Sequence, residues 1–290
     1  MQAVIYYISL PFIYFIAYLP FPLLYLFSDF LNFWVFSVFG YRKEVVQTNL
    51  RSSFPEKSEK ELRAIEKRFY QFFCDLIVET IKTLTITPKQ VKKRVSVDNL
   101  DIYQNYFSQK QSLIMVLGHF GNWELAGARY SQEPYHQLKV IYHPLKNKYF
   151  NRLIIKMRTR LGNGLYPMKE TARCMIQDKN TPTITAFIAD QTPSPERAYW
   201  TTFLNQETPV FFGTEKFSKK FNYPIIYTST KRIKRGYYHI QTEVLVEDPS
   251  KMKEHEISEF HTKRLEKDIV AHPEIWLWTH KRWKHKKPKL

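Results

Sequence analysis

The sequence predicts an α/β fold, with a single domain built on a central mixed, largely parallel sheet flanked by helices. A hydrophobic helix or hairpin is expected to precede this domain. Three observations support the prediction. Short apolar runs alternate with segments of helical periodicity after residue 100. The chain has 290 residues, of which 44 % are hydrophobic, enough for a large core. Charged side chains are nearly absent before residue 42, which sets an apolar segment apart from a charged body.

The first 41 residues are expected to attach the chain to a membrane. Residues 3–28 carry no charge and are long enough to cross a bilayer core of about 30 Å, but prolines interrupt them. A second apolar run, residues 30–41, follows Asp29. A single membrane-crossing helix and a kinked hairpin lying in one leaflet both remain open. Arg42 and Lys43 come next, and by the positive-inside tendency they place the following body in the cytoplasm.

The charge distribution narrows the possible partners. Residues 1–41 contain one charged side chain, Asp29, so the rest of the chain carries a formal net charge of +18, and the whole chain +17. A basic body attracts nucleic acids, anionic lipids or acidic proteins. The neighbouring apolar segment favours lipid, and no nucleic acid is expected as a partner. Cys74 and Cys174 have neither the spacing of a metal site nor that of a disulfide framework.

The elements can be predicted in order along the chain. Residues 58–82 are typical of an amphipathic helix, because Ser58 and Glu61 can form a capping box and apolar residues recur at helical spacing. Residues 112–117 predict a buried strand, and residues 122–130 a helix capped by Asn122. Strands are then expected at 138–143, 181–190, 223–229 and 237–246, the last two as a possible hairpin around Gly236. Helices are expected at 148–161, from Thr214 onwards, and at 257–271.

The stretch GHFGNWELAG, residues 118–127, has the character of a catalytic turn. It contains three of the eight glycines of the chain, and these bracket His119 and Glu124. Glycine permits tight turns and close approach of the backbone to a ligand. The turn follows a predicted strand, and open α/β sheets bind ligands at the carboxyl ends of their strands. A histidine with a nearby carboxylate is suited to general base catalysis, and the free N–H groups of the next helix can face an oxyanion.

Several other chemistries are disfavoured by this stretch. The turn holds no serine or cysteine nucleophile, which argues against a serine-hydrolase elbow and favours direct attack by a substrate hydroxyl. No second histidine stands at helical spacing from His119, so no metal site is expected. The sequence contains neither GxxxxGK[ST] nor GxGxxG, so no nucleotide cofactor is expected either.

At this turn the sequence resembles the lipid A biosynthesis (late, or secondary) acyltransferase family of the lysophospholipid acyltransferase superfamily. GHFGNWE resembles the H-x4-D/E motif of that superfamily, and its N-W-E ending matches this family. The segment GYRKEVVQTNLRSSFPEKSEKE, residues 40–61, resembles the family's sequence after its membrane anchor. Further blocks match in order at residues 142–162, 187–193, 211–217 and 272–284, the last reading HPEIWLWTHKRWK.

The resemblance implies an O-acyltransferase. Such an enzyme moves a fatty acyl chain from acyl carrier protein or coenzyme A to a hydroxyl of a lipid A precursor, in lipopolysaccharide biosynthesis at the cytoplasmic face of the inner membrane. Residues 1–41 would be the membrane anchor and residues 42–290 the acyltransferase catalytic domain. His119 is then the expected base and Glu124 its partner. The candidate substrate-binding residues are Arg158, Arg160, Asn122, Asp190 and Gln191.

Two other functions remain open from the sequence. An enzyme of the same superfamily could act on a different acceptor, such as a lysophospholipid, an aminolipid or a mannosylated lipid. More remotely, the chain could be a non-catalytic protein that binds membranes or anionic lipids through its basic face. The intact pair of His119 and Glu124 argues against the second alternative.

Overall fold

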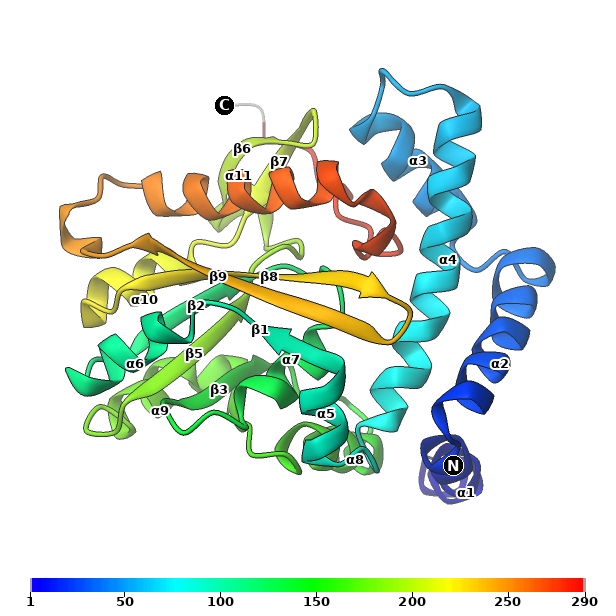
Figure 1. Cartoon of the computed structure of the whole chain (residues 1–290). Coiled ribbons are helices and arrows are strands. Elements are labelled where there is room, and N and C mark those ends of the chain that lie inside the picture. Colours follow the sequence, from blue (N-terminus) through cyan, green and yellow to red (C-terminus); the bar gives the residue numbers. More distant parts are fainter. Residues whose placement is uncertain (1, 289–290) are drawn as a thin grey trace.

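In the computed structural model, which describes residues 2–288, a seven-stranded sheet forms the centre of the molecule (Figure 1). The strand order is β1-β9-β8-β2-β5-β3-β4. Within this sheet β8 and β9 are the antiparallel neighbours and all other neighbouring strands are parallel, so β1 and β9 run opposite to the other five strands. The predicted mixed, largely parallel sheet is therefore confirmed. Its strands are β1 (Val95–Val97), β2 (Leu113–Leu117), β3 (Gln137–Tyr142), β4 (Gly164–Pro167), β5 (Thr183–Ile188), β8 (Ile225–Lys234) and β9 (Tyr237–Val246).

Helices cover both faces of this sheet. In Figure 1, α11 lies above the sheet, whereas α7 and α8 lie below it and α4 stands at its edge. The predicted capping box of Ser58 and Glu61 opens α4, and the side chain of Asn122 caps α7. The helices after the N-terminal segment are α3 (Lys43–Ser53), α4 (Glu59–Lys82), α5 (Pro88–Arg94), α6 (Leu100–Ser108), α7 (Trp123–Tyr130), α8 (Lys148–Thr159), α9 (Thr171–Gln177), α10 (Gly213–Phe221) and α11 (Glu256–Ala271).

The predicted strands and helices thus occur close to their expected bounds. The expected hairpin also forms, with Gly236 in its turn at φ +74°. The sequence did not predict the short edge strands β1 and β4. It also missed an antiparallel pair outside the main sheet, β6 (Tyr199–Phe203) and β7 (Gln206–Val210), which lies beside α11 (Figure 1). These strands have three to five residues each, too few for a clear period-two pattern.

The turn after β2 is held tightly in place. All five residues of β2 are buried, because it lies between β5 and β8 in the middle of the sheet. Gly121 has φ +64°, and a Cβ at this position would lie 1.9 Å from the carbonyl oxygen of Thr230. A Cβ on Gly118 would lie 2.7 Å from the side chain of Leu265. Glycine is therefore required at position 121, where both the positive φ and the backbone of β8 exclude a side chain, and a side chain at position 118 would have to displace Leu265 of α11.

The N-terminal segment forms two helices that meet at a break. α1 (Gln2–Tyr18) continues as a helix through Pro11. The helical conformation stops after Tyr18 and starts again at α2 (Phe21–Asn32), whose N-cap is Pro20. α2 continues as the π-helix η1 (Phe33–Val38). Together α2 and η1 make a helical stretch of 18 residues with a mean hydropathy of 1.4, long and apolar enough to cross a membrane. Figure 1 shows α1 nearly along its axis, whereas α2 runs beside α4, so the two helices cross steeply.

These two helices bury one side in the protein and expose the other. Ile16 of α1 and Leu24 of α2 belong to the hydrophobic core. The exposed large apolar side chains of the segment are Val4, Ile5, Tyr7, Ile8, Phe12, Phe15, Tyr18, Leu23, Leu26, Phe30, Phe33, Trp34, Val38 and Phe39. An apolar surface made of so many side chains suits a lipid environment.

Candidate active site

His119 stands at the carboxyl end of the central strand β2, where Asp190 holds it. Asp190 follows β5, the neighbour of β2 in the sheet, so the two strand ends bring these residues together. The Nδ1 atom of His119 lies 2.6 Å from Oδ1 of Asp190. Oδ2 of Asp190 accepts hydrogen bonds from the backbone N–H of His119 at 2.7 Å and from the indole N–H of Trp276 at 2.8 Å.

These contacts keep Asp190 ionised. Burial alone would raise the pKa of Asp190, but the charge of His119 and the hydrogen bonds from His119 and Trp276 lower it to about 2. An ionised carboxylate can only accept hydrogen bonds, so the proton on the imidazole resides on Nδ1. Nε2 of His119 is then the unprotonated nitrogen, and His119 is one of the residues that line a pocket.

Glu124 occupies a different position from the expected one. The sequence pattern predicts Glu124 as the carboxylate partner of His119, but the structure gives that contact to Asp190. Instead, the carboxylate of Glu124 accepts three hydrogen bonds of 2.6 to 3.2 Å from Arg158 on α8. Burial would lower the pKa of Arg158, but the charge and hydrogen bonds of Glu124 raise it. The prediction and the structure name different partners for His119 because sequence spacing cannot show which strand end lies beside the turn.

The other predicted site residues divide into two groups. Gln191 lies at the site, with its Nε2 atom 3.3 Å from Nε2 of His119, and both residues line the pocket. Asn122 is fully buried, where it caps α7 and donates a hydrogen bond to Glu79. Arg160 donates hydrogen bonds to the backbone oxygens of Thr83, at 3.0 Å, and of Ile86. Arg158 and Gln191 therefore lie at the same pocket as His119. The side chains of Asn122 and Arg160 instead make hydrogen bonds with other parts of the protein.

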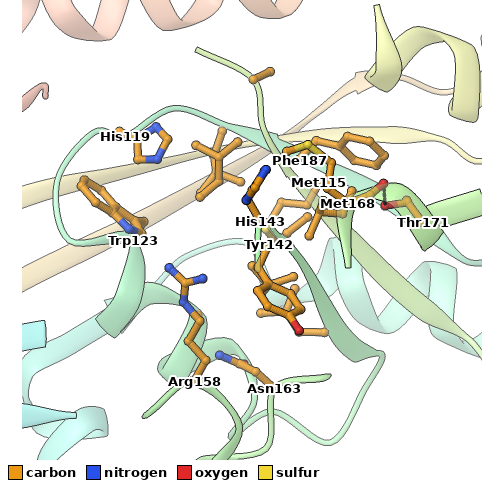
Figure 2. A pocket seen from close by; sticks show the side chains of 18 of the residues that line it. Met115, His119, Trp123, Tyr142, His143, Arg158, Asn163, Met168, Thr171 and Phe187 are labelled. Carbon is orange, nitrogen blue, oxygen red and sulfur yellow. Dashed lines mark hydrogen bonds between the residues drawn. The ribbon is translucent and has the colours of Figure 1, made fainter. Parts of the chain in front are cut away.

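A pocket of about 450 Å³ opens beside His119. Figure 2 shows His119, Trp123 and Arg158 on one side of this pocket, and the apolar Met115 and Phe187 beside the polar His143 on the other. The ring centroid of Trp123 lies 4.8 Å from that of His119 in an edge-to-face arrangement. The volume is in the range of ligand sites. The apolar residues of its lining include Met115, Leu117, Leu138, Val140, Ile154, Met168, Phe187, Ile188, Phe211 and Phe217.

The C-terminal segment supports the turn from behind, a role that sequence reasoning did not assign. The backbone N–H of Gly121 donates to the carbonyl of Ile275 at 2.9 Å, and Phe120 pairs with Trp276 in an isolated β-bridge. Both Trp276 and Asp190 are buried. The signal available in the sequence was the run HPEIWLWTHKRWK, which combines three tryptophans with three lysine or arginine residues.

A histidine that is held by a carboxylate and lines a largely apolar pocket is an arrangement suited to general base catalysis on a ligand bound there. The comparison with protein families agrees. Residues 1–285 match the family of bacterial lipid A biosynthesis acyltransferases, so the chain belongs to that family. Membership of this family implies acyltransferase activity in lipid A biosynthesis. A comparison with curated proteins finds no match.

Proposed function

We propose that this chain transfers a fatty acyl group from an acyl thioester to a hydroxyl of a lipid A precursor. The donor is acyl carrier protein or coenzyme A, and the reaction takes place on the cytoplasmic face of the inner membrane. The observation that carries the proposal is the oriented imidazole of His119 beside an apolar pocket of about 450 Å³, in a chain of the lipid A acyltransferase family. Residues 1–41 act as the anchor and residues 42–290 as the catalytic domain.

The proposed reaction uses His119 as general base and then as general acid. Nε2 of His119 takes the proton of the acceptor hydroxyl as its oxygen attacks the thioester carbonyl. The carbonyl becomes a tetrahedral oxyanion, which collapses with cleavage of the carbon–sulfur bond. The imidazolium returns its proton to the departing thiolate, so the products are an ester and a free thiol. Asp190 stabilises the imidazolium through Nδ1 without taking the proton itself.

Charge on the oxyanion can be stabilised from two directions. The start of α7 presents the backbone N–H groups of Trp123 and Glu124 beside the pocket, and such groups favour negative charge. Arg158 also lines the pocket and is held by Glu124. We assign Glu124 the role of fixing the Arg158 guanidinium, which is then available to a phosphate or to the developing oxyanion. Gln191 contributes a polar group beside Nε2 of His119. Asn122 and Arg160 support the site through the backbone that they hold.

The remaining features suit the proposed substrates. The apolar lining of the pocket can bury an acyl chain, at a gain of about 0.8 kcal/mol per methylene. The basic body attracts both an acidic carrier protein and a phosphorylated glycolipid. The exposed apolar side chains of α1 and α2 keep the pocket close to the membrane that holds the acceptor.

The experiment that tests the function is mass spectrometry of acceptor lipids incubated with the purified chain and each acyl thioester. We expect the lipid A precursor to gain the mass of one acyl group, and His119→Ala to lower this transfer by at least ~10²-fold while preserving the fold. Acylation of a lysophospholipid, an aminolipid or a mannosylated lipid instead would retain the chemistry and replace the acceptor. Lipid binding that survives loss of His119 and Asp190, with no turnover by the parent chain, would show a non-catalytic protein.

A further inference from the structure

Helix α4 carries a buried row of charged side chains that its amphipathic pattern does not explain. Asp75, Glu79 and Lys82 recur at helical spacing, and their exposed fractions are 0, 1 and 6 %. Charged side chains are rarely buried unless they are paired or hydrogen-bonded. All three contact the N-terminal helices or the loop between them. The row therefore forms a polar contact between the anchor and the rest of the protein.

Glu79 occupies the centre of this row and joins three separate elements. Its Oε1 atom accepts a hydrogen bond of 2.8 Å from the hydroxyl of Tyr25, which belongs to α2. Its Oε2 atom accepts hydrogen bonds of 2.6 Å from the hydroxyl of Tyr238 on β9 and from the side-chain amide of Asn122. One buried carboxylate thus connects an anchor helix directly to the catalytic turn.

Asn122 in turn fixes the start of α7. Its Oδ1 atom accepts a hydrogen bond of 2.9 Å from the backbone N–H of Leu125, and its backbone oxygen accepts one of 2.9 Å from Ala126. Asn122 is fully buried and lies three residues after His119. With its amide nitrogen bound to Glu79, the capping side chain can hold only one orientation. The direction of the first turn of α7, which lines the pocket, therefore depends on Glu79.

The contacts around Tyr25 leave it little freedom. A Cβ on Gly236 would lie 1.8 Å from the Tyr25 hydroxyl, so the hairpin turn of β8 and β9 packs closely against that ring. Nearby, Asp75 accepts a hydrogen bond of 2.7 Å from Ser28 of α2. Arg235 bridges Asp75 and Asp29 at 2.7 Å each. These pairs hold α2 in one position along α4.

We infer that Glu79 is a positioning residue, and that through Tyr25, Glu79 and Asn122 the anchor helix α2 sets the geometry of the catalytic turn. The anchor is then a working part of the active site as well as a membrane attachment. This inference rests on the proposed function for its kinetic consequence, because the turn carries His119. Its structural consequence, an ordered turn at residues 118–126, can be measured without any substrate.

The test compares four variants of the full chain in detergent micelles. Tyr25→Phe removes the hydrogen bond from the anchor, and Glu79→Met removes the acceptor for all three donors. Glu79→Gln keeps an acceptor oxygen for Asn122 and Tyr238, while the Tyr25 hydroxyl can turn to accept from the new amide. Tyr70→Phe is the matched control. It also removes a buried tyrosine hydroxyl on the contact between α4 and the N-terminal segment, but that hydroxyl bonds the Tyr41 carbonyl at 2.6 Å, away from the turn.

Two readouts are taken for each variant: hydrogen exchange of residues 118–126 and the separate kcat and KM for acyl transfer. We expect faster exchange in this stretch for Tyr25→Phe and Glu79→Met, and parent-like exchange for Glu79→Gln and Tyr70→Phe. For Glu79→Met we expect kcat to fall about tenfold, equivalent to about 1.4 kcal/mol, with KM for the acyl donor unchanged. Tyr25→Phe should lower kcat about threefold, and Glu79→Gln should restore most of the parent rate.

The outcomes separate the two claims. If Tyr25→Phe and Tyr70→Phe leave exchange in residues 118–126 equally unchanged, the anchor does not position the turn and the inference fails. A fall in thermal stability with an unchanged kcat per folded molecule also overturns it, since that is the result of a purely structural contact. If hydrogen exchange of residues 118–126 changes as expected but the parent chain transfers no acyl group, the inference that α2 positions the turn is supported and the proposed function is rejected. If Glu79→Met does not fold, the comparison of Tyr25→Phe with Tyr70→Phe decides whether α2 positions the turn.

Discussion

Asp190 is the residue on which the proposed base depends, because its carboxylate fixes both the tautomer and the orientation of His119. Asp190→Asn keeps the shape of the side chain but places an amide where the imidazole N–H donates. We expect kcat to fall by ~10²- to 10⁴-fold, the scale seen when a base loses its orienting carboxylate. The measurement is kcat at saturating donor and acceptor. Trp276→Phe, which removes only one donor to Asp190, serves as the milder comparison. Equal rates for the parent and Asp190→Asn would exclude the proposed pairing.

Arg158 and Arg160 are predicted to differ in the property that they affect. Arg158 lines the pocket and binds Glu124 through Nε and Nη2, whereas Arg160 donates to backbone carbonyls beyond the end of α4. Lysine keeps the charge but loses the planar fork. Arg158→Lys should therefore lower kcat/KM by roughly tenfold or more, and Arg160→Lys should lower thermal stability with little change in turnover. The reverse ranking in paired kinetic and melting measurements would move the substrate role to Arg160.

The sequence singles out both His119 and Asp190 but does not predict that they are in contact. His119 was recognisable because glycines, a strand end and a following helix cap surround it. Glu124 was expected as its partner because it lies five positions away. The actual contact comes from Asp190, 71 residues away, and depends on β2 and β5 being neighbours in the sheet. That adjacency is set by long-range strand pairing, which single-sequence periodicity does not contain.

Element by element, prediction succeeded where a pattern repeats over several turns or strand residues. α4 has a capping box and 24 residues of apolar periodicity, and β2 is fully buried, so both were predicted near their true bounds. The edge strand β4 is four residues long and contains glycine and proline, so it has no such pattern. The charged row of α4 was also not predicted, since buried and solvated charges look alike in a sequence. Tertiary contacts with α2 and the turn decide between them.

A buried histidine on α11 and a half-buried one in the C-terminal segment make the fold sensitive to acid. Burial lowers the pKa of His261 on α11 and of His280 in the C-terminal segment to about 4 each, from 6.5. Because the folded pKa is lower than the unfolded one, protonation favours the unfolded chain. Stability from these neutral side chains is present above pH 6.5 and is lost as the pH falls towards 4. For His261, which is 3 % exposed, the slope approaches about 1.4 kcal/mol per pH unit in this window.

This acid sensitivity can be measured by thermal unfolding between pH 4 and pH 7. We expect the melting temperature to fall steadily below pH 6.5, and His261→Gln to flatten part of that fall. Asp190 does not contribute over this range. Its folded pKa of about 2 is below the ordinary 3.8, so its stabilising effect is lost only as the pH falls from 3.8 towards 2. A melting temperature that stays constant from pH 7 to pH 4 would refute the assignment to the histidines.

At the scale of the whole molecule, the N-terminal helices contribute side chains both to the hydrophobic core and to the exposed apolar surface. Ile16 and Leu24 lie in the core, and Glu79 and Asp75 each accept one hydrogen bond from α2, from Tyr25 and from Ser28. Removal of residues 1–41 would therefore take one donor from each of these two buried carboxylates, at a cost of about 1 to 3 kcal/mol for each lost contact. The N-terminal helices are therefore not a separable tether, and the membrane role proposed for them is better tested by substitutions on their exposed side.

The exposed side of α2 is predicted to hold the chain in a membrane independently of salt. Leu26 and Phe30 are 65 and 59 % exposed, so aspartate at either position should leave the fold intact. An aspartate within the hydrocarbon core costs roughly 2.5 to 3.5 kcal/mol, whereas the attraction of the basic body for anionic lipid is screened by salt. The parent chain should therefore stay on vesicles at high salt, and Leu26→Asp with Phe30→Asp should dissociate as salt rises. Phe260→Asp is the matched control, since Phe260 on α11 is 42 % exposed and far from α2 in sequence. Cosedimentation of the full chain with vesicles of neutral and anionic lipid measures both contributions. Salt-resistant binding by the double variant would show that α2 does not enter the bilayer and that other surfaces hold the chain.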